Sequence, residues 1–297
     1  MRNQSPYILK VFGKCNYDVD RHGNKREILF AEAVEDTLET WANKNLLLEP
    51  NYPERLSLRF IGILLDILHG IIHFHLKLKR PHGEICSGNI YIVDGKAKLA
   101  HVVDRFDQNS FVDDINKFCF MVRHLFAKDG LATPLELDQL CNSLRLYKAD
   151  GYLRNSVNHP VLLTPKERGE VRHLAHSLIC ESPNEVKIGK SLVRELQNAS
   201  RKFHGAIQGP HWIGNVSEQE FLGTLNFQNP PYRDIPLDFI RYCRNVGEHV
   251  RGDARKPWIT DEYRDEMLTS FLPGFLPILH DVLSFEGICV RTLPNIT

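Results

Sequence analysis

Apolar and polar residues follow two different periods along this chain, and each period predicts one type of element. Short segments rich in strand-forming residues predict strands over residues 7–13 and 27–34, with a polar hairpin loop between them at 16–25. Asp94-Gly95 separates two more short apolar segments, and this dipeptide is typical of a two-residue hairpin turn. The N-terminal third of the chain therefore contains two predicted hairpins.

Helical spacing dominates the rest of the chain. Residues 56–75 are long and mostly apolar, which predicts a buried helix, and residues 45–53 before them predict a loop. A short helix can begin at Asp36 or Thr37, since either residue type suits the capping position. Further helices are predicted over 114–126, 165–179, 188–203, 218–225 and 236–249, and helical signals continue over 135–153. The tail from 257 to 283 fits closing helices with an apolar face formed by Phe271, Phe275, Leu276 and Leu279. The pattern as a whole predicts a mainly α protein.

One predicted helix carries chemically active residues. Asp238, Asn245 and His249 fall within roughly 40° of each other, at about 100° per residue. The opposite side is apolar and is formed by Phe239, Ile240, Cys243, Val246 and Val250. A polar stripe is usually just a solvated helix face, but a carboxylate, an amide and an imidazole together also suit proton transfer. Arg244 flanks the stripe, and Tyr232 lies just upstream of it.

The composition is that of an ordinary globular protein. The chain has 297 residues, which suits two domains, and 42% of them are apolar and 25% charged. Its 37 basic and 37 acidic residues give a net charge of zero, so any site for a polyanion must be local. Seven scattered cysteines, never in C-x-x-C spacing, argue against a disulfide framework or a zinc site and favour a reducing compartment.

The location expected from the sequence is cytoplasmic. The N-terminal residues lack the apolar core of a secretory signal. The longest apolar stretch, 61–74, is interrupted by glycines and polar residues, and we expect no membrane segment from it. His73 and His75 end this stretch, where a role in the core or at a junction is favoured over metal binding. The sequence thus predicts no metal site.

Residues 82–115 resemble part of a protein kinase. The sequence H-G-E-I-C-S-G-N, which ends at Asn89, stands where kinases carry H-R-D-x-x-x-x-N. The sequence K-L-A-H, which ends at His101, resembles the residues that lead into the kinase D-F-G motif. Asp114 resembles the buried aspartate that opens the large helix of the C-lobe. The resemblance implies a protein-kinase-like C-lobe, preceded by remnant strands of an N-lobe.

The residues that would perform phosphoryl transfer differ from the kinase pattern. Glu84 replaces the catalytic aspartate, and His101 replaces the D-F-G aspartate that holds Mg²⁺. Only Asn89 of the metal-binding pair remains, and the glycine-rich strands and the nucleotide-gripping lysine are missing. We therefore expect residues 1–163 to be a truncated pseudokinase domain. Its kinase activity is predicted to be lost, with ATP and Mg²⁺ binding lost or weak, so no cofactor is expected.

The remainder resembles the kinase-extension nuclease (KEN) family, in which a small helical nuclease directly follows a kinase, as in ribonuclease L and the unfolded-protein sensor of the endoplasmic reticulum. The sequence N-H-P-V-L-L at 158–163 resembles the H-P-F-F that closes the kinase domain there. Family members carry a tyrosine, an aspartate six residues later, R-N after six more and then a histidine. The matching residues are Tyr232, Asp238, Arg244, Asn245 and His249. The resemblance implies an all-helical KEN domain over 164–297.

KEN nucleases cleave RNA without a metal, and the 2′-OH of the substrate is the nucleophile. The resemblance implies that His249 performs one proton transfer and that Tyr232 assists at the other oxygen or at the phosphate. Arg244 would stabilise the phosphate charge, and Asn245 would orient the phosphate or the histidine. Asp238 would pair with Arg244 or His249 and thereby hold the geometry.

Two functions are compatible with these observations. The first is an endoribonuclease attached to a dead kinase module, acting on RNA in RNA processing or in the unfolded-protein or another stress response. The alternative is a catalytically silent pseudokinase scaffold or a dimerisation partner of full-length relatives. The retained nuclease motif favours the first function, and the missing N-lobe elements favour the second. In both cases we expect a homodimer, or a heterodimer with related kinase/nuclease chains.

Overall fold

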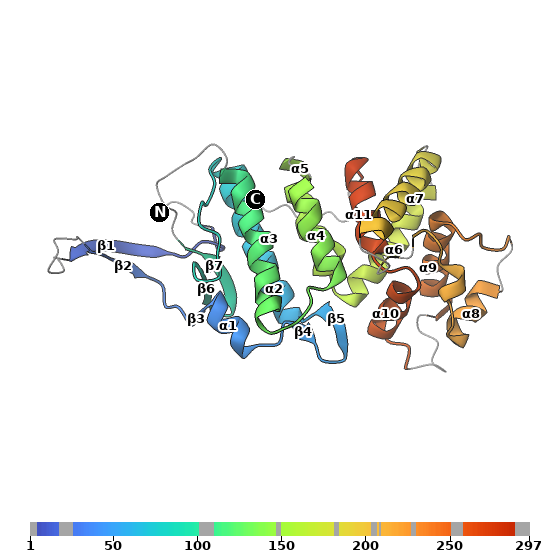
Figure 1. The fold of residues 1–297 in the computed structure, drawn as a ribbon, viewed down its shortest axis with the longest axis horizontal. Coiled ribbons are helices and arrows are strands. Elements are labelled where there is room, and N and C mark those ends of the chain that lie inside the picture. The colour runs from blue at the N-terminus through green and yellow to red at the C-terminus, as the bar shows by residue number, and fades with distance from the viewer. Residues whose placement is uncertain are drawn as a thin grey trace. The chain divides into compact units, whose positions relative to one another are not determined.

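A computed structural model describes residues 5–17, 26–100, 110–146, 150–180, 184–202, 207, 209–226, 230–250 and 258–288. Over these residues the protein has eleven α-helices and seven short strands (Figure 1). The prediction of a mainly α protein is confirmed, because helices account for most of the described chain.

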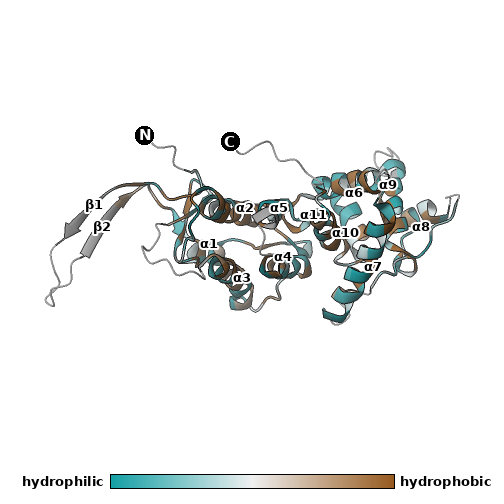
Figure 2. Ribbon diagram, turned by 90° about the horizontal axis from the view of Figure 1, so that it is seen from above, coloured by the Kyte–Doolittle hydropathy of each residue, from teal (hydrophilic) through white to brown (hydrophobic). Residues whose placement is uncertain are grey.

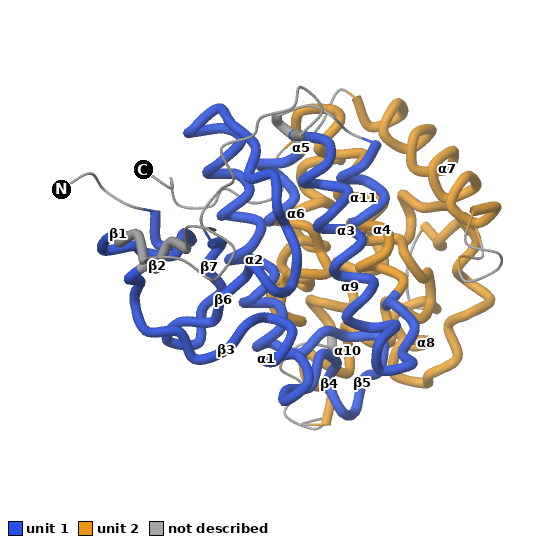
Figure 3. Tube along the Cα trace, turned by 60° about the vertical axis from the view of Figure 1, so that its left-hand side comes forward, with its two compact units in different colours: residues 1–134, 141–157 blue, residues 135–140, 158–297 orange. Residues whose placement is uncertain are grey.

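The chain forms two compact units, which Figure 3 colours separately. Unit 1 comprises residues 1–134 and 141–157, and unit 2 comprises residues 135–140 and 158–297. The helix α4 (Leu135–Leu146) contributes to both units. The side chain of Gln139, near its start, donates a hydrogen bond to the Gly274 carbonyl in unit 2, whereas the Cys141 carbonyl accepts one from the Cys119 thiol in unit 1. The sequence predicted the division between residues 163 and 164, which is slightly later in the chain than the observed change of unit between residues 157 and 158.

Two antiparallel hairpins of unit 1 were predicted from the sequence. β1 (Val11–Tyr17) pairs with β2 (Arg26–Ala31), and the loop at 18–25 lies outside the described residues. β1 begins later than expected, because residues 7–9 exchange backbone hydrogen bonds with Leu99 instead. β6 (Ile90–Val93) pairs with β7 (Lys96–Leu99), and the turn residues Asp94 and Gly95 both have positive φ, at 50° and 70°. A type I′ hairpin turn requires such angles at both positions.

The loop predicted at 45–53 is wrong in part. β4 (Leu48–Glu49) pairs there with β5 (Tyr52–Leu56) around a turn at Pro50 and Asn51. A strand of two residues is too short to show alternation in a sequence, so the pattern could not reveal it. A third short strand, β3 (Asp36–Thr37), pairs with β6 and completes a three-stranded sheet.

The helices of unit 1 begin at polar caps. Thr37 accepts a hydrogen bond from the backbone N–H of Thr40 and starts α1 (Leu38–Lys44), which settles the choice between the two predicted caps. Ser57 caps α2 (Leu58–Ile72) in the same way, and a π-helical turn, His73–Lys77, continues it. The long helix α3 (Ser110–Lys128) and the short α5 (Asp150–Asn155) complete the unit.

Within the described residues, Leu58–Lys77 is the one continuous helical stretch long and apolar enough to cross a membrane. It is longer than the apolar stretch recognised in the sequence, and 56% of its most apolar window is buried inside the protein. The consecutive helices α10 (Asp261–Phe271) and α11 (Phe275–Phe285) pass the same criteria only as a pair, with an 81° bend between them. Core helices also meet these criteria of length and composition.

The described residues of unit 2 form helices and loops, and none of them is in a strand. The unit contains α6 (Pro165–Cys180), α7 (Glu185–Lys202), α8 (Gln219–Asn226) and α9 (Pro236–Val250), followed by α10 and α11. Its helices carry both apolar and polar residues, as the brown and teal segments of Figure 2 show. The apolar faces enclose a core with the fully buried rings of Trp212, Phe221 and Tyr242. The apolar face predicted for the closing helices is confirmed by the burial of Phe271, Phe275, Leu276 and Leu279.

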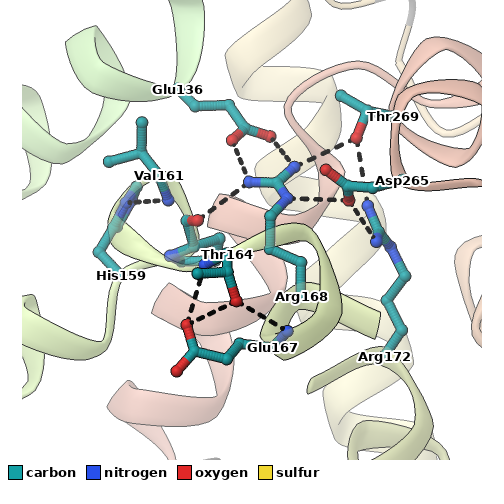
Figure 4. Close-up of polar contacts among 10 residues, drawn as sticks. Glu136, His159, Val161, Thr164, Glu167, Arg168, Arg172, Asp265 and Thr269 are labelled. Carbon is teal, nitrogen blue, oxygen red and sulfur yellow. Dashed lines mark hydrogen bonds and ion pairs between the residues drawn. The ribbon is translucent and has the colours of Figure 1, made fainter. Parts of the chain in front are cut away.

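A buried ion network joins α4, α6 and α10 (Figure 4). Arg168 on α6 binds the Glu136 carboxylate with two N–H groups and the Asp265 carboxylate with Nε, at 2.9 Å. Arg172, one turn further on, also binds Asp265, at 2.6 Å, and Thr269. Burial alone would raise the pKa of Asp265, but the two arginines lower it to about 2. Two cations and two anions are thus paired out of water, which is the condition for buried charges to be tolerated.

Candidate functional site

The predicted polar stripe lies on α9. This helix is continuous, so Gly247 does not interrupt it, and its predicted apolar face is buried at Phe239, Ile240, Cys243 and Val246. The side chain of Val250 lies outside the described part. Asp238 and Asn245 are each only 5% exposed, whereas His249 is exposed. The stripe is therefore not an ordinary solvated face, because two of its three polar residues are buried and need specific partners.

Asn245 is the centre of a short chain of hydrogen bonds. Its Nδ2 donates to the Tyr232 hydroxyl at 2.7 Å, and its Oδ1 accepts from an N–H group of Arg244 at 3.1 Å. Burial raises the pKa of Tyr232 although Asn245 and Arg241 act in the opposite direction, so the phenol stays neutral. The structure thus brings together three of the predicted residues, Tyr232, Asn245 and Arg244, from the loop and the helix.

The pairing predicted for Asp238 is wrong. Its carboxylate accepts hydrogen bonds from the backbone N–H of Arg233, at 2.6 Å, and from Nε of the same residue, at 3.1 Å. Burial by itself would raise the pKa of Asp238, but these bonds and the charge of Arg241 lower it. Asp238 stands in the first turn of α9, where a carboxylate can accept from the preceding loop. It therefore holds the loop that carries Tyr232, instead of binding Arg244 or His249.

Aromatic side chains support this loop from the core. The Trp212 ring packs against Tyr232 and Tyr242 at centroid distances of 5.9 and 4.8 Å, and its Nε1 donates to the Ile235 carbonyl. Asp234 accepts from the backbone N–H groups of Trp212 and Ile213, at 2.7 and 3.0 Å. These contacts fix the segment before α9 at several points, which keeps the Tyr232 hydroxyl in reach of Asn245.

His249 stands apart from the bonded residues. It follows Asn245 by four positions and so lies one turn further along the same face of α9. It is exposed, and the structure gives it no hydrogen bond or ion pair with another described residue. Arg244 is half-buried. The exposed imidazole of His249 and the half-buried guanidinium of Arg244 can each be reached by a ligand from solvent, and the buried Asn245 supports the helix between them.

A second polar arrangement in unit 1 involves the residues that resemble a kinase loop. The carboxylate of Asp114 on α3 accepts from the backbone N–H groups of His82 and Gly83, at 2.6 and 2.8 Å, and contacts His75 Nε2 at 2.9 Å. The His82 ring bonds to the Ala100 carbonyl at 2.8 Å. The loop is therefore held rigidly from both sides by buried groups.

The predicted degenerate kinase residues lie on or next to this loop. Glu84 is exposed, and the side-chain amide of Asn89 donates to the Glu84 carbonyl at 3.3 Å. His101 lies outside the described residues. The Asn89 amide thus bonds to its own loop, while the Glu84 carboxylate is free to face solvent.

One group of side chains in the described part of the chain is close enough together to hold a metal ion. It consists of His159, His280 and Asp281, whose possible ligand atoms lie within 4.8 Å of one another. His159 Nδ1 accepts from the Val161 N–H, so the proton of its neutral ring is on Nε2, which has no described partner. Burial and the nearby His280 and Arg168 lower the pKa of His159 to about 3.

Sequence reasoning missed two arginines that shape the α9 site. Arg233 binds Asp238, and Arg241 lies over the Tyr232 ring at 4.5 Å while it donates to the Pro230 and Pro231 carbonyls. A helical wheel of α9 cannot reveal them, because Arg233 itself and the carbonyl partners of Arg241 lie in the irregular loop before the helix. The one available signal was the proline pair itself, whose fixed φ angles favour a rigid loop.

A scan of the chain against protein-family models gives no match, and a search of curated proteins gives none either. The arrangement of residues in the protein itself must therefore carry any functional assignment.

Proposed function

We propose that this protein is a metal-independent endoribonuclease whose α9 site cleaves RNA through attack by the substrate's own 2′-OH. The observation that carries the proposal is the chain of hydrogen bonds from Tyr232 through Asn245 to Arg244, next to an exposed His249. A carboxylate, Asp238, holds the loop from which the chain starts. The resemblance to the KEN family supplies the reaction, and these contacts supply a physical basis for it.

Cleavage of this kind needs two proton transfers and a cation. The 2′-oxygen bonds to phosphorus as it loses its proton, and the bond from phosphorus to the 5′-oxygen breaks as that oxygen gains one. The products are a 2′,3′-cyclic phosphate and a 5′-hydroxyl. His249 is assigned one proton transfer, because an imidazole can both accept and donate a proton and this side chain is exposed. Arg244 is assigned the charge of the phosphorane.

Tyr232 and Asn245 act as positioning residues in this proposal. Tyr232 is 8% exposed and Asn245 is 5% exposed, so RNA has little access to either. Both polar atoms of the Asn245 amide are already bonded, one to Tyr232 and one to Arg244. We therefore assign them the task of holding the Arg244 guanidinium at a defined place on α9, instead of a direct contact with the 2′- or 5′-oxygen.

The proposal extends to the fold of each unit. We assign unit 1 to a protein-kinase-like C-lobe with remnant N-lobe strands, and unit 2 to an all-helical KEN domain. The support in unit 1 is the Asp114 carboxylate that holds the backbone of His82 and Gly83. With glutamate at position 84 and histidine at position 101, we assign this unit no phosphotransferase activity and at most weak ATP and Mg²⁺ binding.

RNA is the proposed substrate, and a second copy or a related kinase/nuclease chain is the proposed dimer partner, with a cytoplasmic location. The test is cleavage of a stem-loop RNA by the purified chain in the presence of a chelator. We expect a cyclic-phosphate product, and we expect His249→Ala to lower the rate at least about 100-fold, the usual contribution of a proton-transfer group. His124→Ala, at an exposed histidine on α3, is the matched control and should cleave normally.

Equal cleavage by wild type and His249→Ala would refute the assignment of this residue. Sedimentation of the same samples separates the two functions weighed above. Cleavage that rises with the dimer fraction supports the nuclease, whereas dimers without cleavage identify a silent scaffold.

A further inference from the structure

Unit 2 contains a cavity that the proposed nuclease site does not use. It has a volume of about 450 Å³ and lies among α6, α9 and α10. Its lining on α9 comes from Cys243, Gly247 and Glu248, whereas the site residues Asn245 and His249 are absent from it. Pockets that bind small ligands commonly enclose about 300 to 1,000 Å³, so this cavity has the size of a ligand site.

Three cationic side chains line the cavity from two helices. Arg172 on α6 and Arg264 on α10 are buried, at 4% and 6% exposure, and Lys166 on α6 is exposed. Arg172 is held by Asp265 and Thr269, and Arg264 by Asp261. A guanidinium has five N–H donors, and these bonds occupy only some of them. The two arginines are therefore fixed in place while donors remain for a ligand.

Acceptors and apolar atoms complete the lining. Glu170 and Glu248 contribute carboxylates, and Glu248 also approaches His173 at 3.5 Å, from α9 to α6. Cys243 and Leu268 contribute apolar surface, and burial raises the pKa of the Cys243 thiol to about 12, so it stays neutral. The cavity therefore offers cations for an anionic group, carboxylates for hydroxyl or amino groups and an apolar wall.

Two glycines inside helices keep the cavity open. Gly169 and Gly247 both line it, and a Cβ at Gly247 would meet no atom within 4 Å. A Cβ at Gly169 would meet only the Arg264 guanidinium, at 3.7 Å, which is an ordinary contact. Glycine in a helix interior costs about 1 kcal/mol relative to alanine. Packing does not require glycine at either position, in contrast to Gly189, where a Cβ would lie 2.7 Å from Leu237.

We propose that this cavity binds a phosphate ester of nucleotide size, with the phosphate at Lys166, Arg172 and Arg264. A phosphate has the charge and the several acceptor oxygens that match cations converging from two helices. The cavity is larger than a bare phosphate needs, and Glu170 and Glu248 provide acceptors for the hydroxyl or amino groups of the remaining part. The binding site is independent of the nuclease assignment, because it shares no residue with it.

The first experiment is calorimetric titration of the purified full chain with adenosine 5′-monophosphate, with adenosine as the probe that lacks the phosphate. We expect one site with millimolar or tighter affinity for the nucleotide and at least about tenfold weaker binding of adenosine, a difference of 1.4 kcal/mol. Lys166→Ala should weaken nucleotide binding several-fold without unfolding the protein, because this side chain is exposed. Absence of binding at millimolar nucleotide would overturn the proposal.

The variant Gly247→Ala distinguishes an effect on ligand binding from an effect on stability. The added methyl should raise the melting temperature, because it favours the helix, and should lower nucleotide affinity at least about tenfold, because it enters the cavity. Gly223→Ala on α8 is the matched control: its Cβ also meets nothing within 4 Å, but Gly223 does not line the cavity, so binding should be unchanged. A folded Gly247→Ala variant with wild-type affinity would contradict the assignment.

The phosphate ester can come from a free nucleotide or from a nucleotide within RNA. A short 2′-O-methyl RNA, which cannot undergo 2′-OH attack, distinguishes the two sources in competition with adenosine 5′-monophosphate. Displacement of the nucleotide by this RNA assigns the cavity to an RNA-binding role, and lack of displacement assigns it to a free nucleotide. The same titration with His249→Ala should match wild type, so a failed nuclease assignment and a failed cavity assignment remain distinguishable.

Discussion

At the scale of single residues, burial decides what the polar groups of α9 can do. Asn245 and Tyr232 are almost inaccessible to solvent and form a hydrogen bond of 2.7 Å. This buried bond joins the loop before α9 to the helix. Asp238 is buried as well, and its carboxylate takes both a backbone and a side-chain donor of Arg233. His249 is the one member of the predicted stripe that is exposed.

Replacement of Tyr232 by phenylalanine tests this arrangement. Tyr232→Phe removes the acceptor of the Asn245 amide and leaves a buried donor unpaired, which costs about 1 to 3 kcal/mol. We expect the free energy of unfolding in urea to fall by that amount. The double variant Tyr232→Phe with Asn245→Leu should lose less than the sum of the two single variants, because both polar partners are then absent. Strictly additive losses would show that the bond contributes nothing to the fold.

At the scale of elements, helix glycines distinguish close packing from open surface. On α2, a Cβ at Gly70 would lie 2.7 Å from Cδ1 and 2.9 Å from Cγ of Leu99, a fully buried residue of β7. A Cβ at Gly62, two turns earlier on the same helix, would meet nothing within 4 Å. Glycine 70 is therefore required by the contact of α2 with the sheet, whereas glycine 62 is not.

The matched pair Gly70→Ala and Gly62→Ala tests that difference. Gly70→Ala should destabilise the protein by about 1 to 3 kcal/mol, the usual effect of overpacking a filled core. Gly62→Ala should stabilise it by up to about 1 kcal/mol, the gain of alanine over glycine in a helix. Thermal unfolding of both variants against wild type is the measurement. A shift of the same sign in both would contradict the close contact of α2 with β7.

At the scale of the whole molecule, pairs of residues far apart in the sequence define the units. Arg168 joins the first turns of α4 and the middle of α10, through Glu136 and Asp265. This bond network is one reason why residues 135–140 belong to unit 2 although the residues before and after them, up to 134 and from 141 to 157, belong to unit 1. No local pattern near residue 135 indicates such a division.

The network predicts a loss of stability in acid. The pKa of Asp265 is about 2 in the folded protein and 3.8 for an ordinary aspartate, so its contribution is complete above about pH 4 and disappears as the pH falls toward 2. A pKa difference of one unit between the folded and the unfolded protein corresponds to about 1.36 kcal/mol, so the loss of stability is on the order of 2 kcal/mol. Urea unfolding between pH 2 and 6 measures it. Asp265→Asn should flatten this part of the profile, whereas Asp113→Asn, at an exposed residue of α3, should retain it.

The local pattern of the sequence predicted much of this protein. Helical spacing predicted the helices of both units to within a few residues, because burial of one face every 3.6 residues is a local property. Asp94-Gly95 predicted its hairpin turn for the same reason, since the required positive φ angles are intrinsic to those residues. The two-residue strand β4 was beyond such reasoning, because its pairing provides the only evidence for it.

The Tyr232–His249 stretch shows which features follow from the sequence and which depend on the tertiary structure. By itself the sequence determined that Asp238, Asn245 and His249 share one side of a helix with an apolar opposite face. Only the tertiary structure decided that Asp238 binds Arg233, that Asn245 binds Tyr232 and that His249 alone faces solvent. The reason is physical: periodicity fixes the direction of a side chain around its own helix, whereas burial and hydrogen-bond partners depend on loops and helices that fold against it.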